Sequence, residues 1–193
     1  AGLYQIKPTL PFIPGNEISG VVEQLGNKVK HLQVGQRILA MPRNGGLAEL
    51  ICLDEKSCTA IPEALSHESA ASFLVNYCTA HHGLIYCGKV KPKEIVLILG
   101  ASGGVGVAAI DIARALGAEV IAAASTKKKR DACLALGADH VLDYSKKDWR
   151  KDLQKILDGR PLNVVYDPVG GAYAEPALRS LGPDGRFLVV GFA

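Results

Sequence analysis

The pattern of apolar and polar positions changes near residue 75. Before that point, short runs with the composition of β-strands, at 18–23, 36–40 and 48–53, are separated by turns rich in Gly and Pro. Short strands between turn residues predict an antiparallel, partly barrel-like β domain over residues 1–74.

From residue 75 onward, strand-like runs alternate with helical stretches. Residues 95–99 are wholly apolar, which is typical of a strand buried on both faces of a parallel sheet, and residues 104–116 repeat apolar side chains at helical spacing up to Gly117. Further strands are predicted over 120–124, 140–144, 163–167 and 186–190, and further helices over 127–136, 149–157 and 173–181. This alternation predicts an α/β fold with a Rossmann-type doubly wound parallel sheet over 75–193. Because the chain stops directly after a predicted strand, we expect that sheet to lack its last strand.

A glycine-rich loop, Gly100-Ala-Ser-Gly-Gly-Val-Gly106, lies between the first of these strands and its helix. Small residues let the backbone approach a pyrophosphate, and the helix N-terminus offers unpaired N–H groups and the positive end of its dipole. The spacing differs from the strict G-x-G-x-x-G pattern, so a tight strand–helix turn is the alternative interpretation. The strand–loop–helix context favours a bound dinucleotide.

The end of the second strand favours NADP over NAD. An NAD site usually has an acidic residue there to hold the ribose 2′-hydroxyl, whereas this chain has Ser125 and Thr126 followed by the basic run 127–130. Hydroxyls and cations suit a 2′-phosphate. A solvated basic helix start is the alternative, although cations there oppose the helix dipole.

Composition excludes several other classes. The chain has 193 residues and a net charge of +3, which is too small to indicate nucleic-acid binding, and no apolar run approaches the ~18 residues of a membrane helix. Its five cysteines are odd in number and include no C-x-x-C pair, which predicts reduced thiols rather than disulfides or a zinc knuckle. Reduced thiols fit the cytoplasm, or mitochondria if a presequence is missing.

Metal chemistry is not expected from the remaining candidates. Adjacent His81 and His82 point in different directions on a helix and cannot easily share one ion. Asp167 ends a strand at the edge where ligands bind in such sheets, so it either faces a ligand or caps the next helix.

A series of short motifs, taken together, resembles the zinc-independent quinone oxidoreductase, or ζ-crystallin, branch of the medium-chain dehydrogenase/reductases. The motifs lie, in the family's order, at 2–4, 10–17, 35–37, 45–49, 79–80, 100–106, 136–139, 167–171 and 185–186. Asn16 stands where the zinc alcohol dehydrogenases of the superfamily have a His, and the four-cysteine zinc lobe is missing. Both differences favour the zinc-free branch.

The resemblance implies a partial GroES-like catalytic domain over 1–74 and a C-terminally truncated Rossmann domain over 75–193 that binds NADP(H). It implies hydride transfer to a small-molecule quinone or activated enone without zinc. The residues that it assigns to the site are Tyr4 as the candidate catalytic side chain of the nicotinamide and substrate cleft, Asn76 and Thr79 near that cleft, Ser102, Gly103, Gly104 and Val105 around the pyrophosphate, Ser125 and Lys129 at the 2′-phosphate with Tyr144 nearby, and Gly191, Phe192 and Ala193 towards the nicotinamide.

Two alternatives stay open at this point. One is an NADPH-binding module without catalysis, which would be crystallin-like, regulatory or a truncated product. The other is an alkenal or enone reductase of the same branch. Full-length members of the family are expected to be homo-oligomers, and relative to them the chain is expected to be an interior fragment that lacks segments at both ends.

Overall fold

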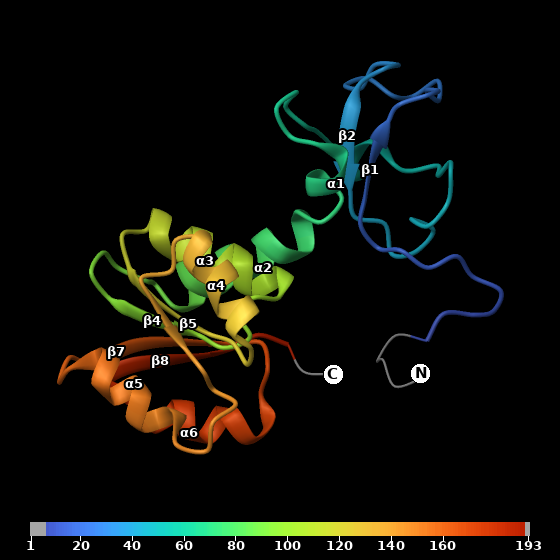
Figure 1. Ribbon diagram of the computed structural model, residues 1–193. Coiled ribbons are helices and arrows are strands. Elements are labelled where there is room, and N and C mark those ends of the chain that lie inside the picture. Colours follow the sequence, from blue (N-terminus) through green and yellow to red (C-terminus); the bar gives the residue numbers. More distant parts are fainter. Residues whose placement is uncertain (1–6, 192–193) are drawn as a thin grey trace. The chain divides into compact units, whose positions relative to one another are not determined.

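The computed structural model describes residues 7–191, which form two units (Figure 1). The chain passes from the first unit to the second between Val75 and Asn76. Each unit has a sheet and a buried core of its own. None of the helices described is long and apolar enough to cross a membrane.

Three short antiparallel strands form the sheet of the first unit. The strands β1 (Ile18–Val21) and β3 (Cys58–Ala60) pair with opposite edges of β2 (Arg37–Ala40). A 3-10 turn, η1 (Glu55–Ser57), leads into β3, and a short helix, α1 (His67–Ala70), follows it. The core of this unit is small, and its buried members are Leu39, Ile61 and Ala70.

The predicted strand over 48–53 is wrong. This segment has no regular secondary structure, and Leu50 is 71% exposed. The segment pairs with none of the three strands of the first unit's sheet, and a β-like composition without such pairing does not make a strand.

Five parallel strands form the sheet of the second unit, in the order β6-β5-β4-β7-β8. They are β4 (Ile95–Ile98), β5 (Glu119–Ala123), β6 (His140–Leu142), β7 (Leu162–Asp167) and β8 (Leu181–Val189). From the central β4 the chain winds outward through β5 and β6, and then returns to β7 on the other side of β4. The order confirms the predicted doubly wound parallel sheet.

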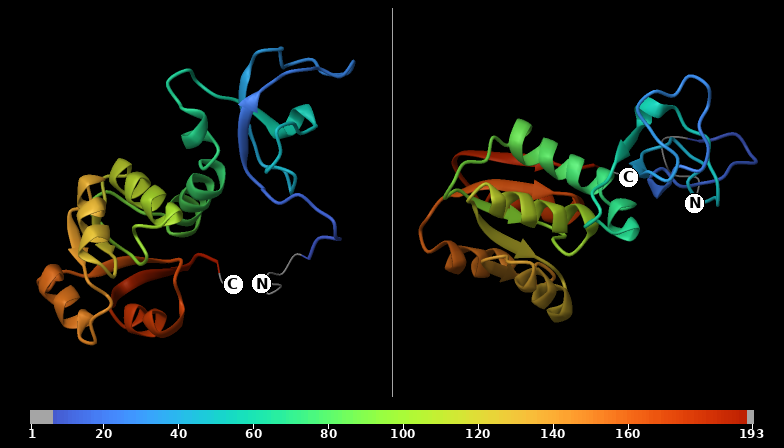
Figure 2. Two further views of the ribbon diagram at one scale, coloured as in Figure 1. Left: turned by 45° about the vertical axis from the view of Figure 1, so that its right-hand side comes forward. Right: turned by 90° about the horizontal axis from the view of Figure 1, so that it is seen from above.

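Helices cover both faces of this sheet (Figure 2). The helices α3 (Gly104–Ala115) and α4 (Lys127–Ala135) lie on one face. The helices α5 (Trp149–Leu157) and α6 (Ala174–Leu178) lie on the other, and a 3-10 turn, η4 (Gly171–Tyr173), precedes α6. Each of the four helices lies within the range predicted for it, and α5 has the predicted bounds.

Alternate residues of each strand face opposite cores. Val96 and Ile98 of β4 are buried together with Ile110 of α3, whereas Leu97 is buried together with Leu153 of α5. Because both faces of the strand are covered, every position along it must be apolar. This is the physical reason for the wholly apolar run in the sequence.

A helical segment with irregular winding precedes β4. Two π-helical stretches, η2 (Leu74–Cys78) and η3 (His82–Cys87), flank α2 (Thr79–His81). A Cβ on Gly83 would lie 2.9 Å from Cε2 of Tyr166, so the glycine allows the ring to approach the helix. The sequence predicts no bounds for this segment, because π-helical winding breaks the 3.6-residue period on which helix prediction depends.

The predicted bounds are wrong at the last connection. The helix predicted over 173–181 ends at Leu178, and the strand predicted over 186–190 begins at Leu181. Leu181 pairs with Leu162 beyond an irregularity in the ladder. Pro183 would interrupt a central strand, but β8 is an edge strand, where a residue without an N–H group is tolerated.

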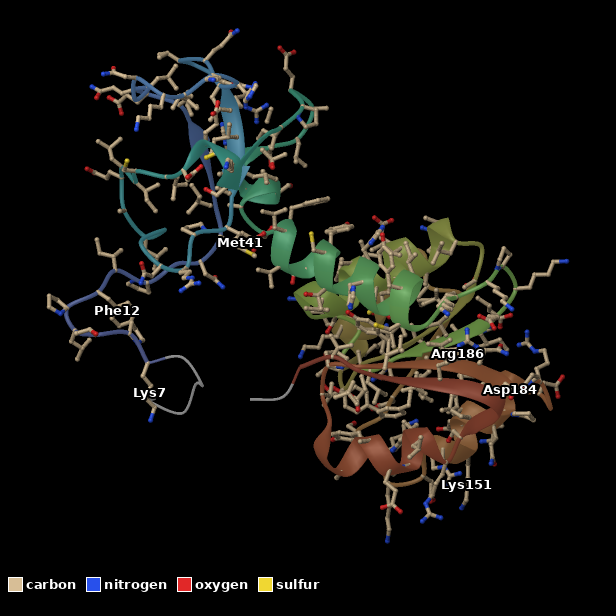
Figure 3. All side chains as sticks on the ribbon, turned by 180° about the vertical axis from the view of Figure 1, so that it is seen from behind. Lys7, Phe12, Met41, Lys151, Asp184 and Arg186 are labelled. Atoms are coloured by element: carbon tan, nitrogen blue, oxygen red, sulfur yellow. The ribbon has the colours of Figure 1, made fainter. Side chains whose placement is uncertain are left out.

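Two bidentate ion pairs lie towards the amino ends of the strands. Arg186, labelled in Figure 3, places Nη1 at 2.9 Å from Oε1 of Glu94 and Nη2 at 2.5 Å from Oε2. Arg160 makes the same kind of contact with Glu119, at 2.6 and 2.9 Å. In each pair the guanidinium, acting mainly through its hydrogen bonds, holds the pKa of the glutamate below its ordinary value. These pairs fix the strands at the edge opposite the glycine loop.

Candidate functional site

The carboxyl ends of the five strands form one edge of the second unit's sheet. The glycine loop follows β4 and Asp167 ends β7, and these two strands are neighbours. The chain leaves β4 towards β5 but leaves β7 towards β8, so the two loops diverge at this point. Ligands of doubly wound sheets bind where loops diverge in this way.

Glycines bring the helix α3 very close to the glycine loop. Gly100 has a positive φ of 60°, and a Cβ there would lie 2.8 Å from Cγ2 of Val169. A Cβ on Gly106 would lie 2.6 Å from the carbonyl oxygen of Gly100 and 2.7 Å from Cα of Ala101. These are backbone atoms that cannot turn aside, so the loop keeps its shape only with glycine at these positions.

The N-terminus of α3 begins at a glycine. Its N-cap, Gly103, has no side chain and makes no side-chain cap. The first N–H groups of a helix, here those of Gly104 and Val105, have no acceptor within the helix. The predicted residues Ser102, Gly103, Gly104 and Val105 therefore lie together around a group of backbone donors suited to an anion.

Asn76 lies against this N-terminus. A Cβ on Gly104 would lie 2.6 Å from Oδ1 and 2.8 Å from Nδ2 of Asn76, so the amide of Asn76 occupies the space beside the glycine. Thr79 begins α2, a helix in contact with α3. The structure thus brings Asn76 directly to the glycine loop, whereas Thr79 is connected to that loop through the contact of its helix with α3.

The end of β5 presents hydroxyl and ammonium groups. Thr126 is the N-cap of α4, and its Oγ1 accepts a hydrogen bond of 3.3 Å from the N–H of Lys129. Lys127 is paired with Asp131 at 2.7 Å. Within the part of the chain that the structure describes, the ammonium groups of Lys128 and Lys129 have no ion-pair partner. Two cations without an ion-pair partner among the described residues therefore lie in the first turn of α4, which begins two residues after Ser125.

The end of β6 carries Asp143 and Tyr144. The ring of Tyr144 packs edge-on against that of Tyr173, with centroids 4.7 Å apart. Burial, together with the nearby Tyr173 and Asp167, raises the pKa of Tyr144, so its hydroxyl is neutral at physiological pH. The structure thus places Tyr144 at the carboxyl edge of the sheet, beside the segment that follows β7.

Asp167 has a structural role at the end of β7. It is 2% exposed, and its Oδ1 accepts hydrogen bonds of 2.8 Å from the N–H groups of both Val169 and Gly170. It therefore caps the turn after β7, which is close to the capping role that the sequence left as one of two alternatives.

The remaining predicted site residues lie at the two ends of the chain. Gly191 follows β8 and has a positive φ of 78°. Tyr4, Phe192 and Ala193 lie outside the described residues, so their predicted roles stay predictions. Sequence reasoning also missed a contact: Arg130, which in the sequence is only one member of a basic run, pairs with Asp143 at 3.0 Å.

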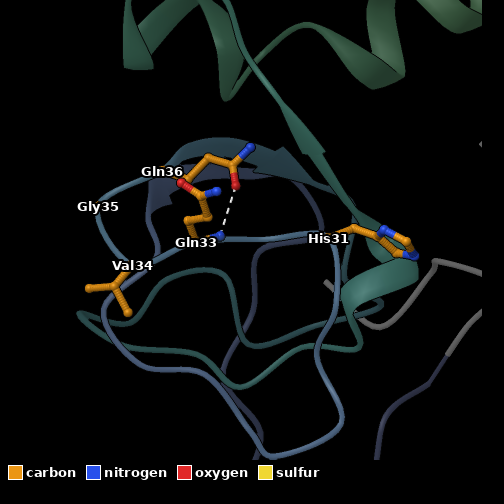
Figure 4. A pocket seen from close by; sticks show the side chains of 5 residues that line it. All are labelled: His31, Gln33, Val34, Gly35 and Gln36. Atoms are coloured by element: carbon orange, nitrogen blue, oxygen red, sulfur yellow. Dashed lines mark hydrogen bonds between the residues drawn. The ribbon is translucent and has the colours of Figure 1, made fainter.

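An open depression of the surface lies in the first unit. It has a volume of about 470 Å³ and is lined by His31, Gln33, Val34, Gly35 and Gln36, none of them a predicted site residue (Figure 4). Across residues 7–191, no group of three or more His, Cys, Asp or Glu side chains is arranged to hold a metal ion. The candidate site is thus defined by backbone donors and cations at the sheet edge.

Comparison with known families identifies the superfamily to which this chain belongs. Residues 2–63 match the family described as alcohol dehydrogenase GroES-like domain, and residues 104–193 match the family described as zinc-binding dehydrogenase. The chain belongs to the medium-chain dehydrogenase/reductase superfamily. Superfamily membership explains why an antiparallel β unit precedes a doubly wound sheet.

Superfamily members similar to this chain include quinone oxidoreductases and proteins like them. Quinone oxidoreductase-like protein 2 of Bos taurus is 39% identical over 193 residues, which are 100% of this chain and 55% of that protein. The quinone oxidoreductase of Escherichia coli, solved in complex with NADPH, has a TM-score of 0.86 and 31% identity over 98% of this chain and 61% of that one. For the quinone oxidoreductase of Thermus thermophilus, also solved with NADPH, the TM-score is 0.81 and the identity 36%, over 96% and 57%. The chain spans about half the length of the curated relatives it matches.

Proposed function

We propose that this chain binds NADP(H) and is part of an oxidoreductase that transfers a hydride to a quinone or an activated enone without zinc. The observation that carries the proposal is the N-terminus of α3, whose N-cap Gly103 makes no side-chain cap, behind a loop whose shape depends on Gly100 and Gly106. Two similar structures are complexes with NADPH, which supports the choice of ligand. In this proposal residues 1–74 belong to the catalytic domain and residues 75–193 to the cofactor-binding domain.

The residues around the loop fit the two phosphate groups of NADPH separately. The N–H groups of Gly104 and Val105 would hold the pyrophosphate, where the positive end of the helix dipole favours an anion. Lys129 and Ser125 would hold the 2′-phosphate, with charge-assisted hydrogen bonds from the ammonium group. A phosphate at this position also relieves the unfavourable placement of cations at the start of α4.

The chemistry divides between the cofactor and the chain. Bound NADPH supplies the hydride. The chain holds the cofactor by its phosphates, and Asn76 lies against the helix N-terminus on which the pyrophosphate would rest. Tyr4, as the proposed catalytic side chain, would contact the substrate beside the nicotinamide. Orientation of the two reactants then lowers the barrier, because it converts a bimolecular step into one within a single complex.

Binding and turnover test different parts of this proposal. The chain is titrated with NADPH and NADH by calorimetry, and then mixed with NADPH and phenanthrenequinone, or a short alkenal, while nicotinamide absorbance is followed. NADPH binding that is tighter than NADH binding, with oxidation by the quinone, is the expected result. A folded chain that binds neither nucleotide refutes the proposal.

The alternatives predict different outcomes of the same assays. Tight NADPH binding without oxidation by either acceptor would favour a cofactor-binding module without catalysis. Oxidation by the alkenal alone would favour an alkenal reductase. Addition of a zinc chelator is expected to leave the rate unchanged, and a loss of rate would contradict the zinc-free reaction.

A further inference from the structure

We propose that an ion pair between Arg130 and Asp143 positions the turn at Ser125 and thereby sets the preference of this chain for NADPH over NADH. The proposal rests on the proposed function, since it concerns the same 2′-phosphate pocket. In it Arg130 and Asp143 are positioning residues that act through Ser125 and Lys129. Neither of the two contacts the cofactor itself.

Arg130 ties the start of α4 to the end of β5. Its Nη1 lies 2.9 Å from the carbonyl oxygen of Ala124, the residue directly before Ser125, and 3.0 Å from Oδ2 of Asp143. The two side chains are only 18% and 17% exposed, whereas those of Lys127 and Asp131 on the same helix are 83% and 55% exposed. Partial shielding from water makes the Arg130–Asp143 contact stronger than an exposed pair.

Asp143 extends this contact to the end of β6. While Oδ2 faces Arg130, Oδ1 accepts hydrogen bonds from the N–H of Ser145 at 3.1 Å and from its hydroxyl at 2.6 Å. The Ser145 hydroxyl also lies 3.4 Å from the carbonyl oxygen of Ser125, but its single proton goes to the closer Asp143. The carboxylate therefore holds together the exits of two strands, between which the Ser125 turn lies.

The same contacts argue against Arg130 as a phosphate ligand. Its positive charge is neutralised by Asp143, and one of its N–H groups is committed to the backbone of Ala124. Arg130 and Lys129 are adjacent on a helix, so their side chains leave it about 100° apart. Lys129, like Lys128, has no ion-pair partner among the described residues, so its ammonium group, unlike the guanidinium of Arg130, stays available to a 2′-phosphate.

The position of this network predicts which ligand it affects. The glycine loop joins β4 to α3, whereas Arg130, Asp143 and Ser145 make their ion pair and hydrogen bonds with one another and with the residues at the ends of β5 and β6. Loosening the Ser125 turn should therefore weaken contacts to the 2′-phosphate and leave those to the pyrophosphate intact. NADPH has the 2′-phosphate and NADH lacks it, so the ratio of their dissociation constants reports on the network.

The Asp143→Asn variant separates positioning from simple charge. It removes a negative charge near the phosphate, so an effect of charge alone would tighten NADPH binding. Asn has one acceptor oxygen, which can serve Arg130 or Ser145 but not both, so positioning predicts weaker binding. We expect the Kd of NADPH to rise about five- to tenfold, which is the usual effect of losing one ordinary hydrogen bond, and that of NADH to change less than about twofold. Tighter or unchanged NADPH binding would overturn the proposal.

Arg130→Met and Ser145→Ala give independent measures of the same network. Both are expected to lower the NADPH preference, Ser145→Ala by less, and either one decides the question if Asp143→Asn fails to fold. Arg160→Met is the matched control, because it breaks a bidentate pair with Glu119 at the opposite edge of the sheet. It should lower the melting temperature without changing the NADPH to NADH ratio.

The outcomes separate this proposal from the proposed function. If the unmodified chain prefers NADPH and the variants at 130, 143 and 145 keep that preference, the positioning role is refuted while the proposed function stands. If the unmodified chain binds NADPH no better than NADH, the 2′-phosphate pocket itself is refuted, and the positioning role with it. An equal loss of the preference for NADPH in Arg160→Met would also refute the positioning role, since general destabilisation would then explain the effect.

Discussion

Gly106→Ala is the substitution whose effect follows most directly from the geometry of the glycine loop. The new Cβ would lie 2.6, 2.7 and 2.8 Å from three backbone atoms, the carbonyl oxygen of Gly100 and Cα and C of Ala101. Ordinary van der Waals contacts of a Cβ begin near 3.4 Å, so α3 must move away from the loop by close to 1 Å.

The magnitude follows from two opposing terms. Overpacking of this kind costs about 1–3 kcal/mol. Replacing glycine by alanine inside a helix returns ~1 kcal/mol, because alanine loses less backbone entropy on folding. We therefore expect a net destabilisation of about 1 kcal/mol. The displaced helix also carries its N–H groups away from the pyrophosphate. This should weaken the binding of both NADPH and NADH at least about tenfold, since geometry errors of 1 Å are costly.

Thermal unfolding and nucleotide titration measure the two effects. Gly20→Ala is the control, because nothing lies within 4 Å of its Cβ position and Gly20 has no positive φ. This control should leave both the melting temperature and the affinity nearly unchanged. A Gly106→Ala variant with the affinity of the unmodified chain for both NADPH and NADH would refute the assignment of the loop as the pyrophosphate site.

Three further predictions follow from single contacts. Lys129→Ala should weaken the binding of NADPH by about 1–3 kcal/mol and leave the binding of NADH nearly unchanged in the same titration. Equal losses of affinity for both nucleotides would refute the 2′-phosphate role of Lys129. Because Arg186 lowers the folded-state pKa of Glu94, the stability from this pair is present above the unfolded pKa and lost as the pH falls through the folded one, so the difference in unfolding free energy between the unmodified chain and Glu94→Gln should shrink from neutral pH to about pH 3. A difference that stays constant over this range would contradict the pairing. Asp167→Ala removes the acceptor of two partly buried N–H groups and should destabilise the chain by about 1–3 kcal/mol in denaturant unfolding, while an unchanged midpoint would show that water replaces the cap.

The second unit was predictable because its strands and helices follow apolar patterns that depend on neighbouring residues and repeat along the chain. Strands such as 95–98 are buried on both faces and therefore wholly apolar, and each helix has one apolar stripe that ends near a glycine. The failures have tertiary causes. Residues 48–53 have the composition of a strand but pair with none of the strands in their unit, and β8 tolerates Pro183 because it is at the edge of its sheet.

The candidate site was predictable to a smaller extent. The glycine loop and the absence of an acidic residue after β5 can be read from the sequence, because each depends on a few consecutive positions. The Arg130–Asp143 pair joins residues 13 positions apart, and its partner choice depends on how β5 and β6 lie side by side. Asn76 was expected near the cleft, but its contact with Gly104 depends on the packing of one helix against another.

The two edges of the parallel sheet differ in how well they tolerate a change of side-chain charge without loss of stability. At the amino ends, Glu94 and Glu119 are held in bidentate pairs, so charge changes there lower the stability of the fold. At the carboxyl ends, the lysines at the start of α4 are exposed and the N-cap of α3 is a glycine that makes no side-chain cap. A lineage could therefore exchange one nucleotide for another through substitutions at the second edge while the first preserves the scaffold, and this separation makes the unit a tractable starting point for redesigning cofactor choice.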